Sequence, residues 1–142
     1  MHLRQLERIL TVVERTLRQQ FPSDFFKRCA YSAFGIRALM KDAGVHAELV
    51  GGDFVAFTMS PHGERAAMQG FGLGDDQCSH FWVEADQRLI DISPCFLPQD
   101  SSYPIVPMPA VAWSFSHSLP RYLRYRSRER FHENSVMSVG AD

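Results

Sequence analysis

The sequence contains no long apolar run, no marked excess of one charge and no even set of cysteines. No apolar stretch approaches the roughly 20 residues that a membrane-spanning helix needs. The formal net charge is −1, so no global field would attract nucleic acid or an acidic membrane. The three cysteines, together with an N-terminus that scatters charges among its apolar residues, are untypical of a secreted protein. We therefore expect a cytoplasmic protein without nucleic-acid or membrane partners.

The overall composition is that of an ordinary globular protein. Apolar residues make up 45% of the chain and charged residues 22%. A length of 142 residues is enough to bury one core but too short for a second independent one. We expect a single domain over residues 1–142.

Two helices are expected in the N-terminal third. Leucine and valine recur at three- and four-residue spacing over residues 2–20, which is typical of an amphipathic helix. After a break at 21–23, a second helix runs to about Ala43, because Gly44 suits a left-handed cap. Cys29 lies at the front of this helix, unless Ser23-Asp24 caps it and places the cysteine in the second turn. The second helix is apolar around most of its circumference, so we expect it to be largely buried.

The rest of the chain favours strands. The pair Gly51-Gly52 separates two β-prone runs and predicts a hairpin turn, because both positions accept positive φ. The glycine-containing stretch 60–77 predicts a long loop, with a short helix over 63–69 as an option. Past a proline-rich connection, the residues AVAWSF predict a further strand, and an arginine-rich segment follows.

Residues 79–85 and 88–93 predict a second hairpin, turning at Asp86-Gln87. A two-residue turn places the apolar side chains of both strands on one face. His80 and Asp91 then share the opposite face on a diagonal of about 7–8 Å, which is within side-chain reach.

Cys29, His80 and Asp91 are the residue types of a cysteine nucleophile with its base and its orienting acid. The thiolate is the reactive form of cysteine, and a helix N-terminus or a nearby imidazole favours it. A carboxylate on the far ring nitrogen fixes the tautomer of the imidazole and stabilises its charged form. Taken singly, each residue also fits a structural role, as a buried thiol, a strand histidine and a turn-capping aspartate.

The stretches RCAYSAFGIRALMKDAGVHAELVGG and HFWVEADQRLIDISP, within about residues 28–94, resemble the transglutaminase-like superfamily of papain-fold cysteine enzymes. The resemblance implies an α+β fold in which a buried nucleophile helix packs on an antiparallel sheet. It implies that Cys29 attacks, His80 acts as base and Asp91 orients it, without a cofactor. The chemistry passes through a thioester and ends in hydrolysis of a peptide, protein or small amide, or in acyl transfer to an amine. The family also contains inactive scaffolds, so the alternative is a catalytically silent domain that binds a peptide or protein partner in the same cleft.

Other residues have weaker assignments. Gln20 is a candidate side-chain donor to the oxyanion, beside the backbone N–H of Cys29. Trp82 is expected to pack over the catalytic face, and lining the substrate cleft is its second option.

A zinc site is the main rival to the triad. It would combine Cys78 and His80 with Cys29 or Cys95, but the paired ligand spacing of structural zinc does not occur. The arginines at 121, 124, 126, 128 and 130 favour a solvated edge or a dimer contact over nucleic-acid binding.

Overall fold

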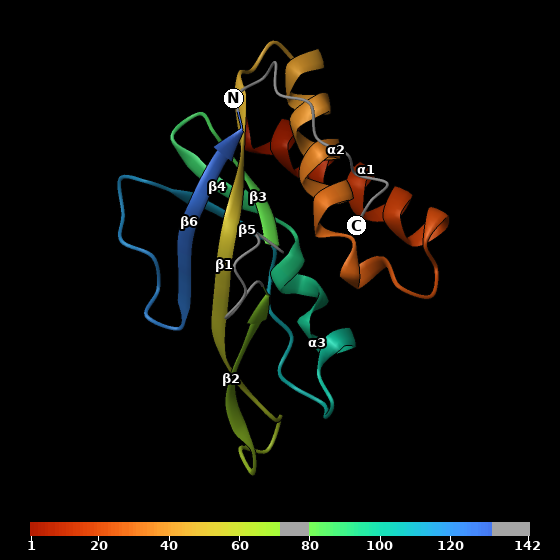
Figure 1. The fold of residues 1–142 in the computed structure, drawn as a ribbon, viewed down its shortest axis with the longest axis vertical. Coiled ribbons are helices and arrows are strands. Elements are labelled where there is room, and N and C mark those ends of the chain that lie inside the picture. The colour runs from red at the N-terminus through yellow and green to blue at the C-terminus, as the bar shows by residue number, and fades with distance from the viewer. Residues whose placement is uncertain (72–79, 132–142) are drawn as a thin grey trace.

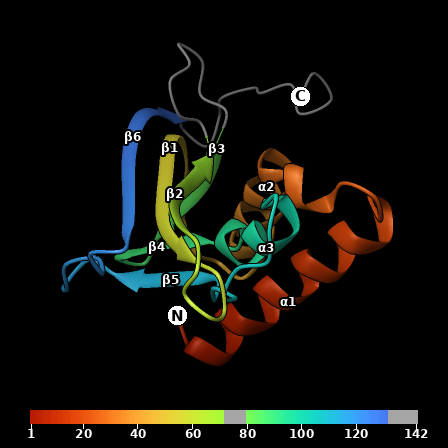
Figure 2. The ribbon, with the colours of Figure 1, turned by 90° about the horizontal axis from the view of Figure 1, so that it is seen from below.

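The computed structural model describes residues 1–71 and 80–131, and Cys78 therefore lies outside the described part. Within it, three α-helices pack on one side of a curled, six-stranded antiparallel sheet, which confirms the expected α+β class (Figures 1 and 2). The helices are α1 (Leu3–Gln20), α2 (Cys29–Asp42) and α3 (Leu97–Asp100), with 3₁₀ turns at Phe25–Lys27 and Ser93–Phe96. The strands are β1 (Ala47–Met59), β2 (Ala66–Phe71), β3 (His80–Ala85), β4 (Arg88–Asp91), β5 (Val111–Ser114) and β6 (Leu123–Phe131). No helix in these ranges is both long and apolar enough to cross a bilayer.

The two long helices form as predicted. α1 buries Leu6, Ile9, Val13 and Leu17, a stripe at three- and four-residue spacing that faces the core. α2 ends before Gly44, whose φ of +79° is the left-handed conformation that glycine adopts without a steric penalty.

β1 is the central strand of the sheet and pairs with three neighbours. Residues 47–52 pair with β3 and residues 54–59 with β2, while residues 49–56 pair with β6 along the other edge. His80 pairs with Gly52, at the point where β1 passes from one neighbour to the next. The candidate base, His80, therefore lies where β1 stops pairing with β3 and begins to pair with β2.

The predicted hairpin at Gly51-Gly52 is wrong, because β1 runs straight through both glycines. Neither has positive φ, and the pairing with β6 shifts register between them, which marks a β-bulge. A Cβ on Gly52 would lie 2.1 Å from the carbonyl oxygen of Arg126 and 2.9 Å from the ring of Trp82. The absence of a side chain at Gly52 thus serves close packing between strands rather than a turn.

The turn after β1 lies further along the chain, where Gly63 has a φ of +76°. The optional helix over 63–69 is also wrong, because residues 66–71 form β2. The hydroxyl of Thr58 in β1 donates a hydrogen bond to the carbonyl of Ala67 in β2. The backbone pairing of β2 with β1 outweighs the weak local preference of these residues for a helix.

The predicted hairpin of β3 and β4 is confirmed. Asp86 and Gln87 have φ values of 52° and 60°, as a two-residue turn between twisted strands requires. The apolar side chains of this hairpin join the core under α1 and α2, and those residues are Phe81, Val83, Ile90 and Ile92. Trp82 and Leu89 instead join a second buried cluster with the side chains of β1 and β6. Both faces of the hairpin are buried, and each fully buried large apolar side chain contributes about 1.5–3 kcal/mol.

Candidate active site

Cys29 is the first residue of α2. The segment 25–27 forms a separate 3₁₀ turn, so the alternative start at Ser23-Asp24 is wrong. Asp24 instead forms an ion pair with Arg28, with 3.0 Å between Oδ2 and Nη2. The first N–H groups of a helix have no partner within the helix, and their partial positive charge favours a thiolate. The thiol of Cys29 is half-buried at this helix end.

His80 and Asp91 lie at the two ends of the β3–β4 hairpin and contact each other. The distance from His80 Nε2 to Asp91 Oδ2 is 2.7 Å, and the side chains are 0% and 1% exposed. The contact inferred from the hairpin register is therefore present. It is a buried, charge-assisted hydrogen bond.

Three neighbouring effects determine the charge of the His80 ring. Burial acts most strongly and favours the neutral imidazole, whereas the charge and hydrogen bond of Asp91, followed by those of Cys29, favour the imidazolium. Together the two side chains outweigh burial and raise the pKa of His80 to about 10. His80 is therefore an imidazolium at neutral pH.

Cys29 also interacts with the His80 ring. Because Nε2 is bound to Asp91, the nitrogen available to the sulfur is Nδ1. Nδ1 is buried, and the interaction with Cys29 favours the protonated ring. The structure thus brings all three predicted residues together.

Aromatic rings enclose the imidazole. Phe71 stacks on His80 with 5.2 Å between ring centroids, and Phe54 and Trp82 each lie 5.7 Å away. Their negative π faces favour a cation and exclude water. Trp82 is 1% exposed, so it packs beside the His80 ring and offers almost no surface to a ligand. Its indole N–H donates to Glu84 at 3.2 Å.

Tyr125 of β6 is a further member of the site that the sequence did not indicate. Its hydroxyl donates to Asp91 Oδ2 at 2.8 Å, the same oxygen that binds His80. The backbone N–H of Ser93 donates to Oδ1 at 3.0 Å, so both carboxylate oxygens are engaged. Burial and then the charge of Asp91 raise the pKa of Tyr125 well above its ordinary value, so the phenol stays protonated.

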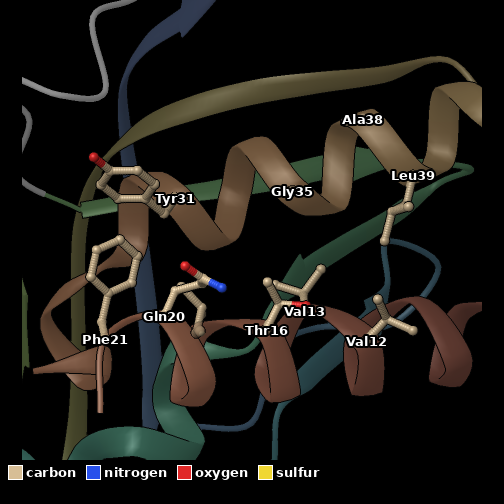
Figure 3. Close-up of a pocket in the computed structure, with 10 residues that line it drawn as sticks. Val12, Val13, Thr16, Gln20, Phe21, Tyr31, Gly35, Ala38 and Leu39 are labelled. Carbon is tan, nitrogen blue, oxygen red and sulfur yellow. The ribbon is translucent and has the colours of Figure 1, made fainter. Parts of the chain in front are cut away.

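Gln20 lines a groove that none of the three triad residues lines. Its side chain is exposed at the end of α1 and lines an apolar groove of about 480 Å³ between α1 and α2, beside Phe21 and Tyr31 (Figure 3). Cys29 does not line this groove. The structure therefore offers no support for Gln20 as an oxyanion donor, and the backbone N–H of Cys29 is the remaining candidate.

The rival zinc site finds no support among the residues that the structure describes. No group of three or more metal-ligating side chains gathers there. Cys95 packs against the core under the helices, and burial raises the pKa of its thiol to about 12. A thiol in that setting is a poor nucleophile and a poor metal ligand.

Three arginines of β6 are paired with carboxylates of neighbouring strands. Arg126 and Arg128 bind Oδ2 of the buried Asp53 at 2.6 and 3.3 Å. Arg130 binds Glu48 at 3.1 Å and also reaches a second glutamate on β3. These pairs neutralise part of the positive patch and agree with a solvated sheet edge.

Comparison with known proteins shows the fold but no family. No family model and no curated protein matches the chain. A match is found with a crystal structure described only as that of a genomics target, at a TM-score of 0.50 and 16% identity. It covers 90% of this chain, which spans 66% of the neighbour's length. At this identity the likeness concerns the fold alone.

Proposed function

We propose that this chain is a cysteine-dependent amide hydrolase or acyltransferase with a papain-like, transglutaminase-like fold. The observation that carries the proposal is the cluster of three groups, in which the buried His80 ring contacts the buried Asp91 at 2.7 Å and also interacts with the half-buried Cys29. The placement of the nucleophile at the start of a helix packed on β3, with base and acid on antiparallel neighbours, supports the papain-like assignment.

In the proposed mechanism the reacting groups are the thiolate of Cys29 and the imidazolium of His80. The sulfur attacks the carbonyl carbon of an amide or ester, and the electron pair of the C=O bond moves to the oxygen. When this intermediate collapses, the C–N or C–O bond breaks and the leaving group takes the proton from Nδ1 of His80. A thioester on Cys29 remains.

The second half of the reaction uses the neutral His80 as a base. It accepts a proton from water or from an amine as that nucleophile attacks the thioester carbon. The C–S bond breaks, the thiolate and imidazolium are restored, and an acid or a new amide is released. Asp91 stabilises the charged ring.

Transition-state charge collects on the carbonyl oxygen. The backbone N–H of Cys29 lies at the N-terminal end of α2, where unpaired N–H groups and the helix dipole favour a negative charge. Such donors are fixed before the reaction and need no reorganisation, and losing one typically costs about 10²–10³ in rate.

The test is acylation by p-nitrophenyl acetate, which needs no knowledge of the natural substrate. We expect a burst of nitrophenolate and an acetyl group on Cys29 by peptide mass spectrometry. Both should disappear in Cys29→Ser and in His80→Ala and persist in Cys95→Ser. Faster release of the acetyl group by added methylamine than by water would indicate a transferase.

A folded wild-type chain that never acetylates Cys29 would overturn the proposal. The catalytically silent domain that binds a peptide or protein partner in the same cleft would then be the better account. Acetylation spread equally over all three cysteines would have the same meaning, because it would reflect exposure rather than activation.

A further inference from the structure

One polar contact of β6, from Tyr125, reaches Asp91 of the candidate triad. We propose that Tyr125 is a positioning residue of the site: its hydroxyl shares Oδ2 of Asp91 with His80 and limits how tightly the carboxylate holds the imidazolium proton. This inference rests on the proposed function and adds a component to it.

The sharing follows from the geometry of one oxygen atom. Oδ2 accepts from Nε2 of His80 at 2.7 Å and from the hydroxyl of Tyr125 at 2.8 Å. Two donors on one buried acceptor spread its negative charge between them, and the low local dielectric makes each bond strong. The Ser93 N–H on Oδ1 keeps the carboxylate plane in place. Tyr125 therefore weakens the hydrogen bond between Asp91 and His80, while the Ser93 N–H still prevents Asp91 from rotating.

The phenol itself is held firmly. Its ring lies 4.9 Å from that of Phe54 and 5.1 Å from that of Trp82. The next residue along β6, Arg126, is tied to the buried Asp53 at 2.6 Å. The Tyr125 ring is packed on two sides, and the strand is anchored next to it. The hydroxyl therefore has one fixed position, as a positioning residue requires.

The chemical consequence concerns the proton of His80. Leaving-group departure needs the imidazolium to release its proton, and an acid whose pKa lies far above neutral releases it reluctantly. The titratable groups facing His80 in the described structure are Cys29 of α2, Asp91 of β4 and Tyr125 of β6. Of these, Tyr125 is the neutral donor that moderates the carboxylate.

The test is the titration of the His80 ring by ¹⁵N NMR in the wild type, in Tyr125→Phe and in Tyr122→Phe. Tyr122 is 46% exposed and just precedes β6, so its variant controls for loss of a phenol from the same region. We expect Tyr125→Phe to shift the titration midpoint upward by roughly half a unit, because the carboxylate then serves His80 alone. Tyr122→Phe should leave it in place. An unchanged or lowered midpoint in Tyr125→Phe would overturn the inference.

Acylation of Cys29 by phenyl acetate, whose more basic phenolate leaves with the proton of His80, provides the second reading. We expect Tyr125→Phe to slow acylation roughly 3–10-fold in the wild type and by less than about twofold in an Asp91→Asn background, since the effect passes through Asp91. An equal loss in both backgrounds would contradict this route. If Cys29 of the wild type is never acylated, the proposed function fails, but the His80 titration still decides whether Tyr125 acts on the ring.

A reciprocal measurement remains if Tyr125→Phe does not fold. In Asp91→Asn the phenol of Tyr125 loses the carboxylate that stabilises its neutral form, so its pKa should fall in an ultraviolet titration. An unchanged pKa of Tyr125 would show that the two groups are not coupled.

Discussion

Oδ2 of Asp91 lies 2.7 Å from Nε2 of His80, with both side chains sealed from solvent. A buried ion pair of this kind gives little net stability relative to an apolar pair, but removal of one partner leaves the other charge uncompensated. The pair is therefore better explained by what it does to His80 than by what it adds to the fold.

Asp91→Asn should lower the pKa of His80 from about 10, because the burial that opposes the charged ring remains while the carboxylate is lost. We also expect a loss of about 3 kcal/mol in the free energy of unfolding. NMR titration of the ring and urea unfolding give the two numbers. A His80 pKa that stays near that of the wild type would mean that Asp91 does not set the charge of the ring.

The stability of the chain should depend on pH through His80. Its pKa is raised from an ordinary 6.5 to about 10 on folding, so the folded state binds the proton more tightly than the unfolded state. This contribution is fully present below about 6.5 and is lost as the pH rises toward about 10. The free energy of unfolding of the wild type should therefore fall across this window relative to that of His80→Gln. Parallel pH curves for the two proteins would contradict the shift.

Gly52→Ala should be strongly destabilising, by about 2–4 kcal/mol, because the new Cβ would meet the Arg126 carbonyl at 2.1 Å. Gly35→Ala is the matched control. There a Cβ would lie 3.4 Å from Val13, and an alanine inside α2 should add up to about 1 kcal/mol. Chemical denaturation of both variants checks the pair. Equal, small effects would show that the close approach at Gly52 is unimportant.

The anchor of β6 can be tested with a double-mutant cycle. Asp53→Asn should cost about 1–3 kcal/mol, because a buried acceptor of the Arg126 guanidinium becomes neutral. Arg126→Gln should then cost less in the Asp53→Asn background than in the wild type. Arg124→Gln, at an exposed position of the same strand, serves as the control. Additive losses from the two variants would indicate that the pair does not stabilise the strand.

Local patterns in the sequence predicted the parts of the site that lie close together along the chain. The β3–β4 hairpin has a two-residue turn and alternating burial, so its register could be counted, and that count brought His80 to Asp91. The start of α2 at Cys29 was ambiguous from the sequence, since two cap positions fitted equally well. In the structure α2 begins at Cys29.

Partners distant in sequence could not be predicted in this way. Gly51-Gly52 has the local signature of a turn, and only the packing of β6 and Trp82 explains why the strand continues. Tyr125 is separated from Asp91 by 34 residues, and the arginines around it in the sequence indicate a charged strand rather than a member of the site. Neither feature is visible before the sheet order is known.

The most direct test of the account is the rate at which iodoacetamide alkylates Cys29 at mildly acidic pH, in the wild type and in His80→Ala. An imidazolium beside the sulfur should keep it in its reactive form, so Cys29 should react at least about tenfold faster than Cys95. His80→Ala should abolish that advantage. Equal, slow labelling of all three cysteines in the wild type, or a Cys29 rate that His80→Ala leaves unchanged, would contradict the thiolate–imidazolium site.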